Sequence, residues 1–212
     1  TGQSQDVPMF VLQMQGWTGT NVSPADPDYI PPTSSPIPIQ QYQAHKRYPK
    51  VVLVAPGYNF IFNDCLHFNG FGQRRIGEYM AKAYSKWVFE GVKWQPTGPK
   101  SVAINGAVVT VKYHVPSPPL VIDTANVTAI ANAGFRYLVG GSSKIASGTA
   151  VPIQSVVVSA PDTITITLQS APVGANQRLE YANYFDFNNT GRPGCPGPTT
   201  GVRGNVRDSD AA

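Results

Sequence analysis

An acidic residue and a histidine stand three positions apart in the stretch NDCLHF, as Asp64 and His67. A histidine takes a proton from a hydroxyl nucleophile best when a carboxylate hydrogen-bonds its other ring nitrogen and fixes the tautomer. A tight turn can bring side chains at this spacing together, so Asp64 and His67 are candidates for an orienting acid and a general base. The alternative is a turn in which Asp64 or Asn69 caps the following helix while His67 packs in the loop.

Four further residues are candidate substrate contacts. Gln13 and Trp17 follow the apolar run PMFVLQM, and a tryptophan face can stack on a pyranose ring. Tyr58 and Asn59 belong to GYNFIFN, just ahead of Asp64, on the same expected rim. The alternative for Gln13 and Trp17 is packing and hydrogen bonding to the backbone.

The histidines and cysteines give no metal signal. His45, His67 and His114 are widely separated, and no pair has the spacing of zinc ligands. Cys65 is interpreted as a buried filler, and an unpaired, reduced Cys65 and Cys195 are favoured over a disulfide. We therefore expect neither a metal nor a cofactor.

The elements that must position these residues follow from apolar periodicity. The runs at 8–14 and 50–55 are nearly continuous and apolar, as in parallel strands buried on both faces. A Pro-rich loop and a modest helix over 39–48 lie between them and complete a βαβ crossover. From residue 76 to 88, apolar residues recur at steps of three and four, which predicts an amphipathic helix packed on a sheet.

After residue 97 the pattern changes to short β-rich segments between turn signals. In TITITLQ apolar and polar residues alternate, as on a half-solvated antiparallel strand, and Asn105-Gly106 predicts a hairpin turn. We expect an antiparallel β-sandwich of jelly-roll type over 98–212, following an α/β domain over 1–97.

Composition narrows the function classes. The net charge of +4 comes from scattered Lys and Arg with no basic run, which argues against a nucleic-acid partner. No apolar stretch approaches the roughly 20 residues of a membrane-spanning helix. The sequence has no Met start and no signal-like N-terminus, so the chain is expected to begin inside a fold.

The order VVLVAP, GYNFIFN, DCLHF and NGFGQRRIGEYMAKAY resembles the last block of SGNH hydrolases, which carry their Asp and His as D-x-x-H. The phrases WQPTGP and YHVPSPPLVIDT are similar to SGNH-type domains of bacteriophage tail spikes and tail fibres. The resemblance implies a flavodoxin-like three-layer α/β domain, of which this chain is the C-terminal part. It also implies His67 as general base and Asp64 as its orienter.

The family's nucleophile has no convincing counterpart in this chain. Ser4, in TGQSQ, resembles a family serine phrase only superficially, because no strand precedes it. The resemblance therefore implies a nucleophile and oxyanion donors on a missing N-terminal half of the same protein, and a chain that is inactive alone. The intact protein is expected to be a homotrimeric tail-spike esterase of the virion tail that deacetylates bacterial surface polysaccharide.

Two other functions stay open. A non-catalytic carbohydrate-binding or structural module would retain D-x-x-H as a relic, and a bacterial esterase acting on cell-wall sugars would share the chemistry. A serine after a buried strand, upstream of Asp64, would favour the enzymes over the module.

Overall fold

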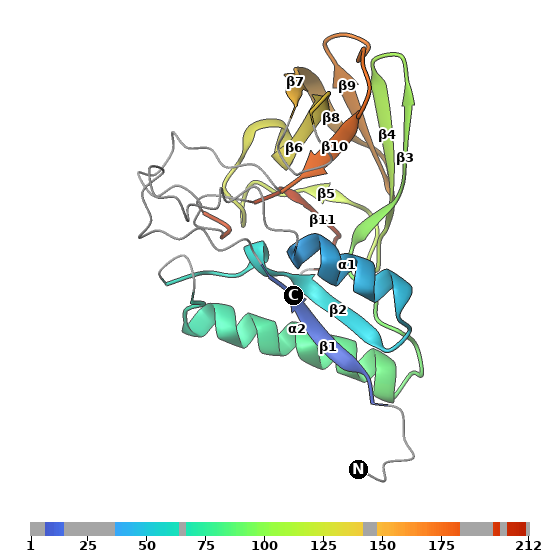
Figure 1. The fold of residues 1–212 in the computed structure, drawn as a ribbon. Coiled ribbons are helices and arrows are strands. Elements are labelled where there is room, and N and C mark those ends of the chain that lie inside the picture. The colour runs from blue at the N-terminus through green and yellow to red at the C-terminus, as the bar shows by residue number, and fades with distance from the viewer. Residues whose placement is uncertain are drawn as a thin grey trace, which may run out of the picture.

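The computed structural model describes residues 7–14, 37–63, 67–141, 148–182, 197–199 and 203–210. Two helices and two parallel strands come first along the chain, and antiparallel strands follow (Figure 1). None of the described helices is long and apolar enough to cross a membrane.

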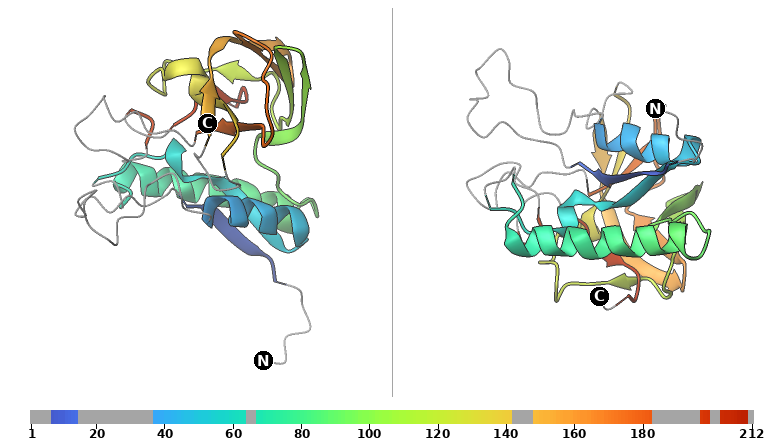
Figure 2. Two further views of the ribbon diagram at one scale, coloured as in Figure 1. Left: turned by 45° about the horizontal axis from the view of Figure 1, so that its top comes forward. Right: turned by 90° about the horizontal axis from the view of Figure 1, so that it is seen from below.

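The first strands are β1 (Met9–Gln13) and β2 (Val51–Pro56), which pair in parallel. Helix α1 (Ile37–Arg47) connects them, and α2 (Gly70–Val88) follows β2 after the short 3-10 turn η2 (Gly57–Asn59). The parallel pair lies between the two helices (Figure 2). Both faces of β2 are therefore covered, which explains why its sequence is a continuous apolar run.

Helix α2 begins at a side-chain cap and buries one stripe. The Asn69 side chain accepts a hydrogen bond from the Gly72 N–H at 2.8 Å, as expected of an N-cap asparagine. Apolar residues of α2 then pack with β2 around a small core that includes Ala83 and Phe60. The predicted helix is confirmed, and it starts six residues before the apolar stripe that predicted it.

The expected flavodoxin-like three-layer domain is wrong for this chain. Such a domain is built on a parallel sheet of about five strands, whereas the described residues contain two parallel strands and two helices. Most described strands belong instead to several small antiparallel sheets. A continuous apolar run shows only that both faces of a strand are buried. One helix on each face of β2 is enough to bury it, so the run did not require a larger parallel sheet.

The largest sheet has four antiparallel strands in the order β3-β4-β9-β8. Their bounds are β3 Gly98–Asn105, β4 Val108–His114, β8 Ile153–Ala160 and β9 Thr163–Leu168. A tight turn joins β3 to β4 at Gly106, whose φ of +58° suits glycine, and the predicted hairpin is confirmed. Ile164 and Ile166 of β9 are fully buried, as their alternation with threonine predicted.

Two smaller antiparallel sheets face the same core. One has the order β10-β6-β7, and the other pairs β11 with β5. Their bounds are β5 Val121–Ile122, β6 Phe135–Val139, β7 Thr149–Val151, β10 Arg178–Tyr181 and β11 Val206–Arg207, with the 3-10 turn η3 at Ala131–Gly134. A jelly roll needs two sheets of four strands, and the described residues form one such sheet, so the jelly-roll expectation is wrong for the part of the chain that the structure describes. The alternation of apolar and polar residues within single strands predicted antiparallel pairing. It carries no information on which strands belong to the same sheet.

The apolar residues form two clusters. One surrounds β2 and α2, and the other gathers side chains from the antiparallel sheets. Contacts from the last described segment join them: Asp210 accepts a hydrogen bond from the Lys82 ammonium at 2.6 Å, and Asp208 accepts one from the Thr97 hydroxyl at 2.9 Å. Division into independent domains near residue 97 remains a prediction.

Candidate active site

The candidate site is the loop of residues 57–69, which connects the carboxyl end of β2 to the start of α2. In open α/β arrangements, sites are built on loops of this kind, where a strand ends and a helix begins. The residues described here are 57–63 and 67–69; Asp64, Cys65 and Leu66 lie outside the described residues.

Backbone pairing closes the loop at its base. Phe62 and Phe68 form an isolated antiparallel bridge, and their rings lie 4.4 Å apart between centroids. The Asn63 N–H donates to the His67 carbonyl at 2.7 Å, and the Asn69 N–H donates to the Ile61 carbonyl at 3.0 Å. Asn63 and His67 are therefore held side by side.

His67 is exposed, while its neighbour Asn69 makes the helix cap. The part of the alternative reading in which Asn69 caps the helix is thus correct, and the part in which His67 packs in the loop is not. An exposed imidazole on a fixed backbone can receive a proton from a substrate or a nucleophile. The pairing of Asp64 with His67 remains a prediction.

Gly72 allows the loop to lie against the first turn of α2. A Cβ built at this position would come within 2.5 Å of the Ile61 carbonyl oxygen, closer than any real Cβ tolerates. Glycine is therefore required by the close approach of two backbones. Sequence reasoning missed this residue, although a glycine in the first turn of a strong helix, in NGFG, is the signal that indicates it.

Residues 197–199 lie beside the loop. A Cβ built at Gly197 would lie 3.7 Å from the Phe60 carbonyl oxygen and 3.8 Å from the Phe62 ring. The Pro198 carbonyl accepts a hydrogen bond from the Thr128 N–H at 2.8 Å, and the buried Arg203 donates to the Thr128 carbonyl at 2.7 Å. The loop thus lies close to both α2 and residues 197–199, and the latter are tied to Thr128.

Of the predicted substrate contacts that the structure describes, two side chains contact other residues of the chain and one is exposed. Gln13, at the end of β1, donates its amide to the Pro38 carbonyl at 2.8 Å, and Trp17 lies outside the described residues. The Tyr58 ring packs against the Tyr181 ring of β10, and burial raises the pKa of Tyr58 to about 12. Asn59 is exposed beside it. Gln13, Tyr58 and Asn59 lie at the carboxyl end of the parallel pair, where the His67 loop also begins. Their role toward a substrate remains a prediction.

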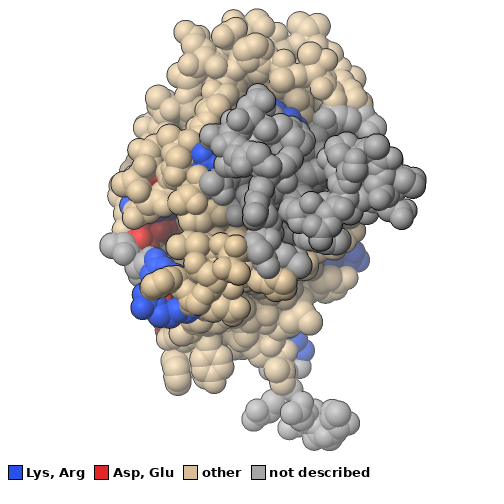
Figure 3. Space-filling model, turned by 90° about the vertical axis from the view of Figure 1, so that its left-hand side faces the viewer, with Lys and Arg blue, Asp and Glu red and all other residues tan. Residues whose placement is uncertain are grey.

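The described residues contain no group of three or more His, Cys, Asp or Glu side chains that could hold a metal ion. On the face drawn in Figure 3, Lys and Arg form small groups separated by uncharged surface. The described residues on this face form no continuous basic stripe that could follow a phosphate backbone.

No protein-family model and no curated protein matches the sequence. Among solved structures, the chain is similar to a carbohydrate acetylesterase from Xanthomonas citri, with a TM-score of 0.61 and 15% sequence identity. The match covers 96% of this chain and 39% of that protein, so the chain spans about two fifths of the length of its structural relative. At this identity the likeness is one of fold: the chain folds like part of a carbohydrate acetylesterase.

Proposed function

We propose that this chain is part of a carbohydrate esterase of SGNH type, which removes O-acetyl groups from a bacterial surface polysaccharide by serine-dependent acyl transfer. The observation that carries the proposal is the exposed His67 on a loop fixed at the carboxyl end of a parallel strand, in a fold shared with a carbohydrate acetylesterase. The loop's two supports, α2 and residues 197–199, favour a site whose base keeps one position.

In the proposed mechanism His67 takes the proton of a serine hydroxyl as its oxygen attacks the acetyl carbonyl. The protonated imidazole then gives that proton to the departing sugar oxygen, and an acetyl-serine remains. Water attacks the acetyl group with His67 again as base, which releases acetate and restores the serine. Asp64 hydrogen-bonds the imidazole and stabilises its charged form. The serine and the oxyanion donors belong to residues outside 1–212.

The wider context is proposed from the sequence resemblance alone. The intact protein would be a homotrimeric bacteriophage tail spike, located on the virion tail, whose substrate is the host's polysaccharide. A non-catalytic glycan-binding module is the competing role, and the activity assay below separates the two.

The test compares the 212-residue chain with the longest polypeptide encoded in frame with it. We expect the longer polypeptide to hydrolyse p-nitrophenyl acetate and to release acetate from an O-acetylated bacterial polysaccharide, while the 212-residue chain does neither. His67→Ala should lower kcat/KM of the longer polypeptide by at least about 100-fold, the usual contribution of a general base. His114→Gln, a histidine on β4 remote in sequence from the loop, is the matched control and should leave kcat/KM within about 2-fold.

Turnover that survives His67→Ala would remove His67 from the mechanism. Binding of the polysaccharide without acetate release, by a longer polypeptide that is folded, would replace the esterase with the binding module.

A further inference from the structure

Charge is distributed unevenly along the chain. Residues 37–63 and 91–122 contain no Asp or Glu, so the permanently charged side chains of both segments are all Lys or Arg. The fold brings the two segments into contact, because α1 lies beside the start of β3 (Figure 1) and the Tyr42 hydroxyl donates to the Pro99 carbonyl at 3.1 Å. Cations that are scattered in the sequence are therefore gathered on one region of the surface.

Four lysines of these segments form what we call the basic patch: Lys46 of α1, Lys93 before β3, Lys100 of β3 and Lys112 of β4. The Lys93 ammonium donates to the carbonyls of His45 and Tyr48 at 2.6 Å and 3.0 Å, which holds it at the end of α1. Ser101 pairs with Lys112 across β3 and β4, so Lys112 lies beside Lys100.

Electrostatic effects show that these lysines act on the same neighbours. Burial lowers the pKa of Lys93, and the charge of Lys46 lowers it further. The pKa of His114, on β4, is lowered by burial, by Lys100 and by Lys46, while Asp208 has a smaller, opposite effect. His114 is therefore neutral at pH 7 and adds no charge to the patch. An anion bound among the lysines would relieve their mutual repulsion.

The charge of the basic patch is not compensated within the part of the chain that the structure describes. No carboxylate there forms an ion pair with any of the four lysines, and Lys46, Lys100 and Lys112 are exposed. Other described cations do pair with carboxylates: Arg74, Arg75, Lys82, Lys86, Arg136, Arg178 and Arg207. The positive potential of the patch is thus available to an external partner.

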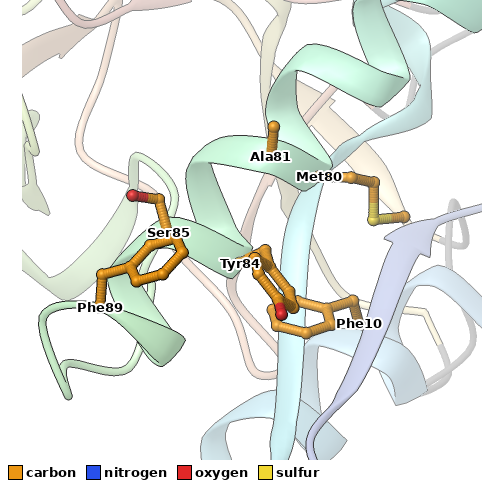
Figure 4. A pocket seen from close by; sticks show the side chains of 6 residues that line it. All are labelled: Phe10, Met80, Ala81, Tyr84, Ser85 and Phe89. Carbon is orange, nitrogen blue, oxygen red and sulfur yellow. The ribbon is translucent and has the colours of Figure 1, made fainter.

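The apolar pocket between β1 and α2 offers nothing to such a partner. Figure 4 shows its uncharged lining of Phe10, Met80, Ala81, Tyr84, Ser85 and Phe89. Arg74, Arg75 and Lys86 of the same helix are already paired with Glu78 or Glu90.

The basic patch and the His67 loop lie toward opposite ends of β2. The Val51 N–H, at the amino end of this strand, donates to the same Tyr48 carbonyl that holds Lys93. The loop of residues 57–69 begins at the other end, and the six residues of β2 span about 20 Å. A ligand that contacts both places has to be a polymer.

We propose that the basic patch binds the negatively charged groups of a polysaccharide, so that the esterase acts on an anionic polymer, such as one that contains uronic acids. Carboxylates would accept charge-assisted hydrogen bonds from the lysines. The ring of Tyr48 is 50% exposed next to Lys93 and offers a face on which a sugar ring can stack. The choice of a polysaccharide, among anionic polymers, rests on the proposed function.

The test measures binding of the longest in-frame polypeptide to polygalacturonate, with neutral dextran as the comparison. We expect binding to polygalacturonate alone, and a loss of at least about 10-fold in affinity between about 0.05 M and 0.5 M salt. Replacing Lys46, Lys100 and Lys112 together by Gln should weaken binding at least about 5-fold. Lys93 is kept because it holds the end of α1.

The matched control replaces Arg74, Arg75 and Lys86 together by Gln, which removes the same charge from α2, and should change the affinity by less than about 2-fold. Urea unfolding verifies that both triple variants are folded. Equal losses in the two triple variants, or equal binding to dextran, would overturn the proposal. Tighter binding to a single-stranded oligonucleotide or to phosphatidylglycerol vesicles would overturn it in favour of a nucleic acid or a membrane.

The same polypeptides, assayed with p-nitrophenyl acetate, separate this proposal from the proposed function. This ester is small and neutral, so the patch variant should keep its kcat/KM. A polypeptide that binds polygalacturonate through the patch and hydrolyses no ester would overturn the esterase alone. An active esterase that does not bind polygalacturonate would overturn the basic patch alone.

Discussion

The ring of Tyr58, in the loop after β2, packs edge-on against the ring of Tyr181 on β10, with their centroids 6.4 Å apart. Tyr181 in turn contacts Phe135 at 4.7 Å between centroids, and its hydroxyl accepts a hydrogen bond from the Val206 N–H at 2.9 Å. This chain of contacts joins the candidate site to the core of the antiparallel sheets. Changes far from His67 in sequence should therefore alter the stability of the loop that carries it.

Tyr181→Phe should destabilise the protein by about 1–3 kcal/mol, because the buried Val206 amide loses its acceptor. Urea unfolding measures the change. Tyr48→Phe is the matched control, since the Tyr48 side chain is 50% exposed, and it should shift stability by no more than about 0.5 kcal/mol. An unchanged midpoint for Tyr181→Phe would show that the hydroxyl contributes nothing to the fold.

Two glycines of α2 should respond to alanine with opposite signs. Gly72→Ala places a Cβ against the Ile61 carbonyl oxygen, so the loop or the helix must shift, and we expect a loss of about 1–3 kcal/mol. Gly77→Ala meets nothing within 4 Å and should stabilise the helix by up to about 1 kcal/mol. Thermal unfolding of the two variants checks the prediction, and a stabilising Gly72→Ala would contradict the close approach of loop and helix.

Asp123 should make the protein sensitive to acid. Burial opposes its charge, but hydrogen bonds from Asn126 and the Arg207 guanidinium, at 2.6 Å, hold the pKa of Asp123 well below its usual range. Because the pKa is lower in the folded than in the unfolded chain, this stability is present above pH about 4 and is lost as the pH falls further.

Asp123→Asn removes the charge that Arg207 contacts and should cost about 1–3 kcal/mol at neutral pH. It should also flatten the decline of stability below pH about 4, measured by urea unfolding across pH. Glu90→Gln, an exposed carboxylate paired with Lys86, is the control and should leave the profile unchanged. If Asp123→Asn loses stability below pH about 4 as steeply as the wild type, the acid sensitivity comes from other groups.

His45 should give a second pH dependence, nearer neutrality. Burial, together with the charge of Lys93, lowers the pKa of His45, and its Nδ1 accepts the Leu53 N–H only when the ring is neutral. The unfolded chain then binds more protons, so stability should fall as the pH drops below about 6.5.

His45→Gln retains an acceptor and cannot titrate, so it should reduce the loss of stability between pH 7.5 and 5.5. The pKa of His114 is also lowered, by burial and by Lys100. The comparison is therefore made in a His114→Gln background, with urea unfolding as the measurement. The same pH slope with and without His45 would contradict the buried, neutral imidazole.

Local elements could be predicted from the sequence because periodicity reports local burial. The strand expected at 50–55 is found at Val51–Pro56, and the helix expected over 39–48 is found at Ile37–Arg47. The number of strands in each sheet could not be predicted, because the VVLVAP run shows only that β2 is covered and not by what. Chain-distant pairings, such as that of β11 with β5, leave no periodic signal.

The position of the candidate site in the fold could be predicted from the sequence. The tertiary contacts that hold its loop could not. A histidine between an apolar strand and a helix start indicates a loop, and His67 lies on that loop. The close approach at Gly72 and the contact of Tyr58 with Tyr181 depend on neighbours brought in by the tertiary fold. Asp64 and Trp17 lie outside the described residues, and their predicted roles remain predictions.

Residues 203–210 reach back to Lys82, Thr97 and Asp123, across more than 80 residues of sequence in each case. During synthesis, Lys82, Thr97 and Asp123 leave the ribosome long before residues 207–210, with which they form hydrogen bonds. Because contacts between distant residues form late and slowly, α2 and the 123–130 loop stay incompletely held until residue 210 has emerged. The emergence of residues 207–210 from the ribosome therefore sets the earliest time at which α2 and the 123–130 loop can complete these contacts.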